Sequence, residues 1–101
     1  MVRFAIFLLS ASACFGADHS VGQKDREFSQ ASITVKPGDT VTFQNADTVV
    51  HNVFSSTPGM EFEIRRQAPG GSSTIPFAKE GVSEVRCSIH PKMKMLVTVK
   101  K

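Results

Sequence analysis

The sequence predicts an all-β protein, built from short strands that form a sandwich or a barrel. Apolar and polar residues alternate in several short segments with the two-residue period of a half-buried strand. Gly and Pro turn signals separate these segments, and no long helical segment interrupts them. The chain has 101 residues, which is enough for one small domain.

Six segments have the alternation or the β-branched composition of strands. In the fifth segment the alternation places Cys87 on the same face as Val85, and in the fourth Pro76 indicates a sheet edge or a bulge. Residues 60–66 are ambiguous, and residues 67–73 have the composition of a loop. The expected strands are Ile33–Val35, Thr40–Gln44, Val49–Ser55, Thr74–Phe77, Val82–Cys87 and Leu96–Lys100.

Residues 1–16 have the composition of a secretory signal peptide. Arg3 supplies a positive charge, an apolar run follows, and small residues precede an expected cleavage site after Gly16. The apolar run is too short for a membrane-spanning helix, which needs about 20 residues. We therefore expect residues 17–101 to be an exported domain. The alternatives are a first core strand or helix and a lipid anchor at Cys14.

Charge and cysteine content limit the classes of function. Twelve basic and nine acidic residues give a net charge of +3, without the dense basic stripe of a nucleic-acid binder. We expect no nucleic-acid partner and no stable membrane insertion. Because Cys14 belongs to the expected leader, Cys87 is the only thiol of the exported domain. Such a thiol is a liability in an oxidising compartment unless it is occupied, or buried as an inert small hydrophobe.

The motif Cys87-x-x-His90-x-x-Met93 places three metal-binding side chains in one short segment. Pro91 favours a sharp turn within it, and His51 lies in a β-rich run that can form a neighbouring strand. Together these residues offer one thiolate, two imidazoles and one thioether. This is the donor set of a blue-copper site, which has a plane of two His and one Cys with a weak axial Met.

Three segments resemble the cupredoxins, the blue-copper proteins of the plastocyanin, amicyanin and pseudoazurin kind: residues 35–45, 47–53 and 81–99. The resemblance implies a Greek-key β-sandwich over residues 17–101. It also implies a periplasmic electron carrier with one copper ion that alternates between Cu(I) and Cu(II). The copper ligands that it implies are His51, Cys87, His90 and Met93.

The resemblance also bears on the axial ligand. Met93 lies three residues after His90, which is the short-loop spacing of amicyanin, whereas Met95 lies five residues after it, as in plastocyanin. We favour Met93 and expect Met95 to fill the core from the last strand. We expect Met60 to lie near the copper end, where it would contribute with Pro91 to an apolar surface around His90.

Related cupredoxins also suggest how the ligand segments are tied together. The resemblance implies that the N–H of Asn52 binds the sulfur of Cys87, while the Asn52 side chain meets the hydroxyl of Ser88. Hydrogen bonds to the sulfur tune the reduction potential of such a site. The alternative is an ordinary turn asparagine.

The two histidines are expected to differ in exposure. His51 should be buried in a strand, whereas the edge of His90 should be exposed and serve as the electron port. Lys92 and Lys94 add positive charge there, which suits transient docking of an acidic or mixed-charge redox protein. They would equally suit a solvated strand edge that resists aggregation. We expect the protein to be a monomer.

The number of histidines and the donor set bear on other functions. An autonomous copper enzyme needs more histidines than His19, His51 and His90, so we expect no enzymatic activity. Zinc prefers more thiolates, imidazoles or carboxylates than this donor set offers. Copper storage or delivery would use the same ligands and stays open. Cleavage after Gly16 would place His19 third from the amine of Ala17, where it can bind a second Cu(II), unless it is a disordered terminal residue.

Overall fold

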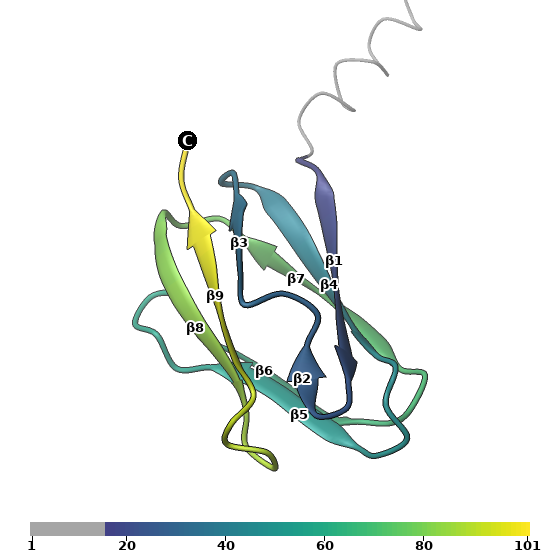
Figure 1. Cartoon of the computed structure of the whole chain (residues 1–101). Coiled ribbons are helices and arrows are strands. Elements are labelled where there is room, and N and C mark those ends of the chain that lie inside the picture. Colours follow the sequence, from purple (N-terminus) through teal and green to yellow (C-terminus); the bar gives the residue numbers. More distant parts are fainter. Residues whose placement is uncertain (1–15) are drawn as a thin grey trace, which may run out of the picture.

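Two β-sheets face each other in the computed structural model, which describes residues 16–101 (Figure 1). Apart from Gly16, the expected leader lies outside the described residues, as does Cys14. Within the described part, no helix is long and apolar enough to cross a membrane. The strands are β1 (Asp18–Lys24), β2 (Glu27–Phe28), β3 (Ser32–Val35), β4 (Asp39–Asn45), β5 (His51–Ser55), β6 (Phe62–Gln67), β7 (Ser72–Phe77), β8 (Gly81–Cys87) and β9 (Lys94–Val99).

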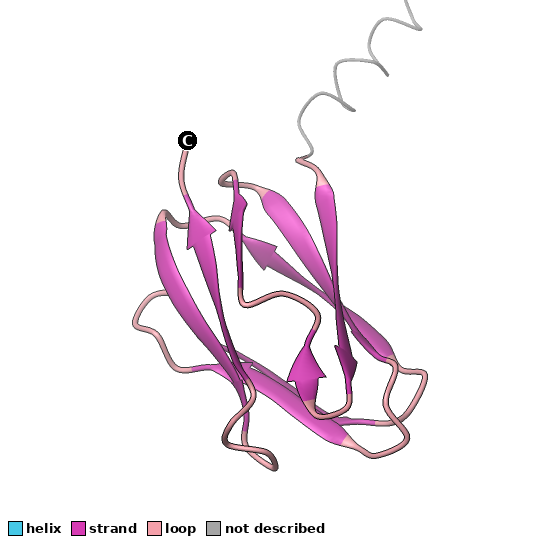
Figure 2. Cartoon of the chain, viewed as in Figure 1, coloured by secondary structure: helices cyan, strands magenta, loops and turns pink. Residues whose placement is uncertain are grey.

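The two sheets mix parallel and antiparallel pairs. One has the order β2-β1-β4-β7 and the other the order β3-β9-β8-β5-β6. The pairs β1–β4 and β3–β9 are parallel, and the others are antiparallel. Figure 2 shows only strands and loops in the described part of the chain. The all-β prediction is therefore confirmed.

All six expected strands are present, within small differences at their ends, and the ambiguous segment forms β6. The ambiguity has a local cause, because Arg65 and Arg66 are exposed in succession, and the pairing of β5 with β6 shifts register at this point. Pro76 lies in β7, which is an edge strand, as predicted. Proline has no N–H to donate, and an edge strand tolerates this because one of its sides has no neighbouring strand.

Strands β1 and β2 were not expected from the sequence. In β1 the alternation toward the core includes only one strongly apolar residue, Val21, followed by the fully buried amide of Gln23. The Nε2 of Gln23 donates to the Oε1 of Gln67 at 2.6 Å. This strand is held by parallel pairing with β4 and by a buried amide contact, neither of which local hydrophobic periodicity reveals.

Aromatic rings join the sheets in the core. Phe43 of β4 is fully buried and stacks on Phe62 of β6, with ring centroids 5.8 Å apart. Phe62 in turn makes an edge contact with Phe77 of β7. Because β4 and β7 belong to one sheet and β6 to the other, these contacts are between sheets. Burial of such rings is a large part of what holds a sandwich together.

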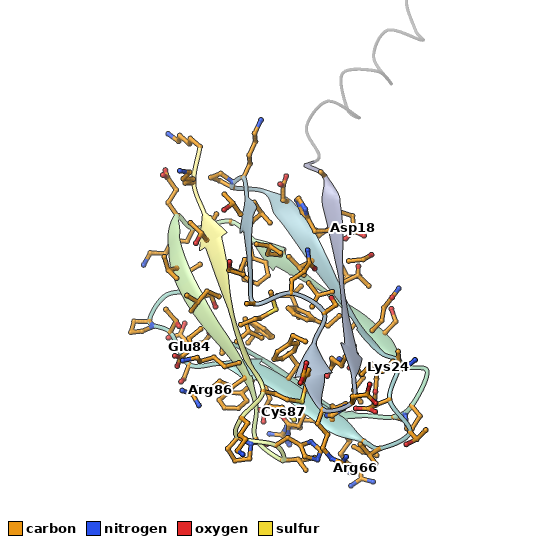
Figure 3. All side chains as sticks on the ribbon, in the orientation of Figure 1. Asp18, Lys24, Arg66, Glu84, Arg86 and Cys87 are labelled. Carbon is orange, nitrogen blue, oxygen red and sulfur yellow. The ribbon has the colours of Figure 1, made fainter. Side chains whose placement is uncertain are left out.

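The antiparallel neighbours β5 and β8 determine where the candidate ligands meet. Strand β5 starts at His51 and β8 ends at Cys87, and Val53 pairs with Cys87, so both ligands lie at one end of the sandwich. The loop between β8 and β9 lies at this end, opposite the C-terminus (Figure 1). We call it the metal end. In Figure 3, Cys87 and Asp18 mark the two opposite ends of the molecule.

Met60 does not lie at the metal end, and that prediction was wrong. A Cβ atom at Gly81, the first residue of β8, would lie 3.3 Å from the Met60 sulfur. Met60 therefore lies at the end where β8 begins, whereas Cys87 is where β8 ends. It packs against the hydrophobic core there, because the loop between β5 and β6 turns at the far end of both strands.

Candidate metal centre

His51 and Cys87 form the buried wall of the candidate site. His51 is 0% exposed and Cys87 is 1% exposed. The Sγ atom of Cys87 lies 3.6 Å from the Nδ1 atom of His51. Both residues are held by paired strands, since His51 pairs with Gln67 of β6 and Cys87 pairs with Val53 of β5. The expectation of a buried His51 is confirmed.

His90 comes from the loop between β8 and β9. It is half-buried, and its Nδ1 atom lies 3.9 Å from the Cys87 sulfur and 3.3 Å from the Nδ1 atom of His51. The loop is tight, because the N–H of Met93 donates to the carbonyl of His90 at 2.9 Å. This turn brings His90 back over Cys87, as the Pro91 turn signal predicted.

The three donor atoms form a triangle with sides of 3.3, 3.6 and 3.9 Å. A point about 2.1 Å from all three lies inside this triangle, near the bond lengths of about 2.0–2.3 Å that such nitrogen and thiolate ligands form with a divalent first-row metal. The chemistry also fits, because a soft thiolate with two imidazoles in a trigonal arrangement suits copper. The residues present therefore fit a single copper ion.

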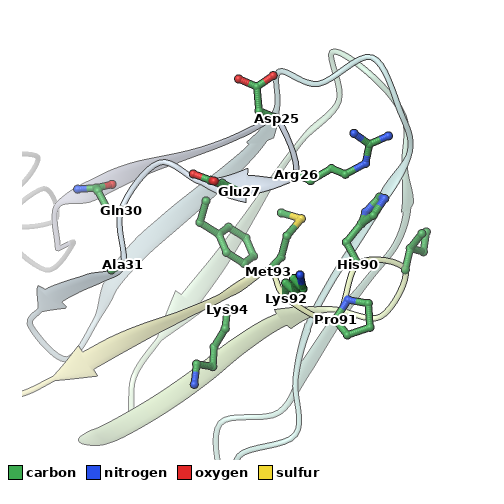
Figure 4. Close-up of a pocket in the computed structure, with 12 residues that line it drawn as sticks. Asp25, Arg26, Glu27, Gln30, Ala31, His90, Pro91, Lys92, Met93 and Lys94 are labelled. Carbon is green, nitrogen blue, oxygen red and sulfur yellow. The ribbon is translucent and has the colours of Figure 1, made fainter.

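Met93 and Met95 differ in their surroundings although both are 1% exposed. Met95 lies in β9 opposite Val85 and belongs to the hydrophobic core between the sheets. Met93 lies in the ligand loop, outside that core cluster. In Figure 4 the side chains of Met93 and His90 lie around the same part of a groove, together with that of Arg26.

The backbone of Asn52 ties the ligand strands together. Its N–H donates to the Cys87 sulfur at 3.4 Å, and its carbonyl accepts from the N–H of Ser88 at 3.3 Å. The expected contact between the Asn52 side chain and the Ser88 hydroxyl is not present. Among residues 16–101, the Oδ1 atom of Asn52 is instead buried without a hydrogen-bond partner. The two segments are therefore joined by the backbone of Asn52 rather than by its side chain. Ser88 is exposed at the start of the loop.

Asp47 contacts the far side of the His51 ring and was missed as a site residue. Its Oδ2 atom lies 2.8 Å from the Nε2 atom of His51. The N–H of Arg26, helped by His51 and by the N–H of Asp25, lowers the pKa of the Asp47 carboxyl to about 2. A carboxylate four residues before a ligand histidine, in a turn after a strand, is the sequence signal that could have found it.

His90 borders an open groove of about 780 Å³ at the metal end. The ligand loop forms one wall, and the β1–β2 turn with β2 forms the other. Ile89 is 50% exposed there, next to the charged and exposed side chains of Arg26, Lys92 and Lys94. The expectation that His90 reaches the surface, unlike His51, is confirmed.

His19 lies at the end of the sandwich opposite the metal end. It is part of β1, and its Nε2 atom lies 3.0 Å from the Oδ2 atom of Asp39. The N–H of Ala17 donates to the other oxygen of Asp39, and the Ala17 carbonyl accepts from the N–H of Thr40. His19 is therefore an ordered strand residue rather than a disordered terminal one.

A β-sandwich that gathers one thiolate and two imidazoles at one end, with a thioether in the same loop, defines a cupredoxin. The comparison with known families agrees. Residues 16–100 match the copper binding proteins of the plastocyanin/azurin family, and the chain belongs to this family. The family match also confirms the prediction of a non-enzymatic protein.

Two relatives support this assignment. The chain is 28% identical over 105 residues to the methylamine utilization protein MauL of Methylophilus methylotrophus, covering 90% of this chain and 60% of MauL. It is 32% identical over 76 residues to amicyanin-alpha of Methylorubrum extorquens, covering 72% of this chain and 64% of that one. The chain thus spans less than two thirds of the length of both relatives.

The fold has solved counterparts. A structure of a reduced amicyanin variant superimposes with a TM-score of 0.75 at 26% sequence identity. The superposition covers 84% of this chain and 83% of that chain. The predicted cupredoxin-like Greek-key sandwich is confirmed by this agreement and by the two-sheet architecture.

Proposed function

We propose that this protein carries single electrons between redox partners by means of one copper ion held by His51, Cys87, His90 and Met93. The observation that carries the proposal is the triangle of donor atoms, two of them buried and the third at the surface. A bound copper ion supplies a one-electron couple between Cu(I) and Cu(II). The other properties of the site come from the residues of this chain.

Fixed ligands favour electron transfer over catalysis. His51 and Cys87 belong to paired strands, and the Met93 N–H closes the loop that carries His90. The donor atoms therefore have little freedom to move when the charge of the site changes, and a small reorganisation allows a fast transfer. The half-buried edge of His90 offers a short route to the surface, while His51 is shielded from water.

The assignment of Met93 as the axial ligand is part of this proposal. Its place in the ligand loop supports it, together with its nearly complete burial outside the core cluster. Met95 faces the core opposite Val85, where its thioether fills space between the sheets. A shift of β9 by two residues would be needed to bring Met95 to the position of Met93.

We also propose transient docking of an acidic or mixed-charge redox protein at the face that carries His90. The exposed Ile89 and Pro91 offer an apolar centre, and Lys92 and Lys94 offer positive charge beside it. Such association is expected to weaken as salt screens these charges. A monomer that is exported to the periplasm through a leader at residues 1–16 completes the proposal.

The test is to add Cu(II) to the purified protein and to record its visible spectrum and its voltammogram. We expect an intense sulfur-to-copper charge-transfer band and a reversible one-electron wave. The variant Cys87→Ser should lack the band, because it lacks the thiolate. A colourless protein that only reduces Cu(II) and retains Cu(I) would contradict the electron-carrier proposal and favour copper storage or delivery.

A further inference from the structure

The Asp47 carboxylate determines which nitrogen of His51 is free to bind a metal. A carboxylate oxygen accepts hydrogen bonds, so the Nε2 atom of His51, 2.8 Å from the Oδ2 atom of Asp47, carries the ring proton. In the neutral ring the Nδ1 atom then has the lone pair. It is this Nδ1 atom that faces the Cys87 sulfur at 3.6 Å. The contact therefore fixes both the tautomer and the orientation of the ring.

The same carboxylate holds the turn between β1 and β2. Its Oδ1 atom accepts from the N–H of Asp25 at 3.1 Å, and its Oδ2 atom accepts from the N–H of Arg26 at 2.9 Å. Asp25 and Arg26 have φ angles of 53° and 60°, in the left-handed region that costs free energy for residues other than glycine. The two hydrogen bonds offset this cost.

Asp47 is itself held in place by Asn45. The Oδ1 atom of Asn45 accepts from the N–H of Asp47 at 2.9 Å, while its Nδ2 atom donates to the carbonyls of Val49 and Gln67 at 2.8 Å. These bonds brace the segment between β4 and β5 on both sides of Asp47. The carboxylate is therefore presented by a fixed backbone rather than by a free loop.

We propose that Asp47 is a positioning residue that locks the metal-binding tautomer of His51 and couples this ring to the β1–β2 turn beside His90. Only the part of this proposal that concerns copper rests on the proposed function, because Asp47 positions the ring of His51 in the metal-free protein too. One consequence is that a change in the turn alters the ring of His51. Arg26 lies in this turn and lines the same groove as His90.

The chain contains a matched control for this contact. Asp39 accepts from the N–H groups of Ala17 and Lys36 and lies 3.0 Å from the Nε2 atom of His19. It thus has the same set of partners as Asp47, two backbone N–H groups and one imidazole. Asp39 begins β4, whereas Asp47 follows the end of β4, so the two carboxylates lie at opposite ends of the sandwich.

The first experiment uses metal-free protein labelled with ¹⁵N. Nitrogen shifts of the histidine rings and amide hydrogen exchange are compared between the wild type, Asp47→Asn and Asp39→Asn. An asparagine has one acceptor oxygen, so Asp47→Asn cannot satisfy His51, Asp25 and Arg26 together. We expect the Nε2–H tautomer of His51 in the wild type, and in D47N either a loss of that tautomer or faster exchange of the turn amides.

D39N should change His19 and leave the ring of His51 and the turn amides as they are in the wild type. Unchanged ring shifts of His51 together with unchanged exchange of both turn amides in D47N would overturn the proposal. Asp47→Ala, which removes all three acceptor contacts, provides the second variant, and in it both the tautomer and the turn protection should be lost. Retention of either one in D47A would equally contradict the coupling.

The second experiment loads the same variants with copper. Second-sphere partners of metal-bound histidines typically contribute about 10–100-fold to metal affinity. We expect a loss of that order in D47A, and a higher reduction potential because a negative charge near the metal is removed. D39N should match the wild type in both. If no variant, the wild type included, forms a blue site while the first experiment succeeds, the proposed function fails and the positioning role stands.

Discussion

Two histidines of the same site have different surroundings, and the difference gives the site an inside and an outside. His51 is fully buried, with its Nε2 atom held by Asp47. Within residues 16–101, no hydrogen bond holds the Nε2 atom of His90, whose ring is half-buried. In the proposed function, a partner would therefore approach the copper through His90 without disturbing the ring of His51.

The two methionines should respond differently to replacement by leucine. Met93→Leu should raise the reduction potential, because an apolar group replaces a donor atom and disfavours the more highly charged Cu(II). Met95→Leu should leave the potential unchanged and cost less than about 1.5 kcal/mol of stability, as swaps of similar volume do in cores. Voltammetry and urea unfolding measure the two effects. An unchanged potential in M93L would show that Met93 is not the axial ligand.

Among the elements, the β1–β2 turn carries the clearest backbone strain. Lys24 pairs with Glu27, so Asp25 and Arg26 occupy the two central positions of a tight hairpin, both with positive φ. Hairpins of this kind favour Asn-Gly, because glycine adopts positive φ without a steric penalty. The Asp47 bonds to the turn explain why a sequence without glycine is tolerated here.

Arg26→Gly is therefore expected to stabilise the protein by about 0.5 kcal/mol, since relief of left-handed strain exceeds the added entropy of the unfolded chain. The N–H that donates to Asp47 is retained in this variant. Urea unfolding of the metal-free protein measures the change. Arg65→Gly in β6 is the control, and it should destabilise because Arg65 lacks a positive φ. A loss of stability in R26G would mean that the Arg26 side chain outweighs the strain.

For the molecule as a whole, Asp39 connects the two sheets at the end opposite the metal. It begins β4 of one sheet and accepts from the N–H of Lys36, which follows β3 of the other. The Lys36 N–H, together with His19 and the Ala17 N–H, lowers the pKa of the Asp39 carboxyl from 3.8 to about 2. The charged form is thus favoured in the folded state.

The sign of the pH dependence follows from this shift. The pKa of Asp39 is lower in the folded state than in the unfolded state, so its contribution is complete above about pH 4 and is lost as the pH falls toward 2. Urea unfolding of the metal-free protein between pH 6 and pH 2 should show falling stability in this window. Asp39→Asn should make this fall less steep, and the part that remains includes the contribution of Asp47, whose pKa is also lowered to about 2. An equally steep fall in D39N would assign the effect to other carboxyl groups.

Much of the fold was predictable because it depends on local periodicity. Alternation identified β4 and β8. In β8 it also predicted that Cys87 lies on the core side of the sheet. Strand β1 escaped prediction because its inward positions include a glutamine, which is stable there only through its contact with Gln67, 44 residues away. Met60 was misplaced because a loop residue has no periodicity that indicates its end of the sandwich.

The sequence by itself determined the donor atoms and the short spacing of the ligand loop, since Cys87, His90 and Met93 are covalent near-neighbours. Only the tertiary structure decided how His51, 36 residues from Cys87, meets the sulfur, and which nitrogen it presents. The physical reason is that strand pairing and the bulge in β5–β6 fix the position of His51, while a carboxylate from the neighbouring turn fixes its proton. Both depend on contacts between segments that share no local pattern.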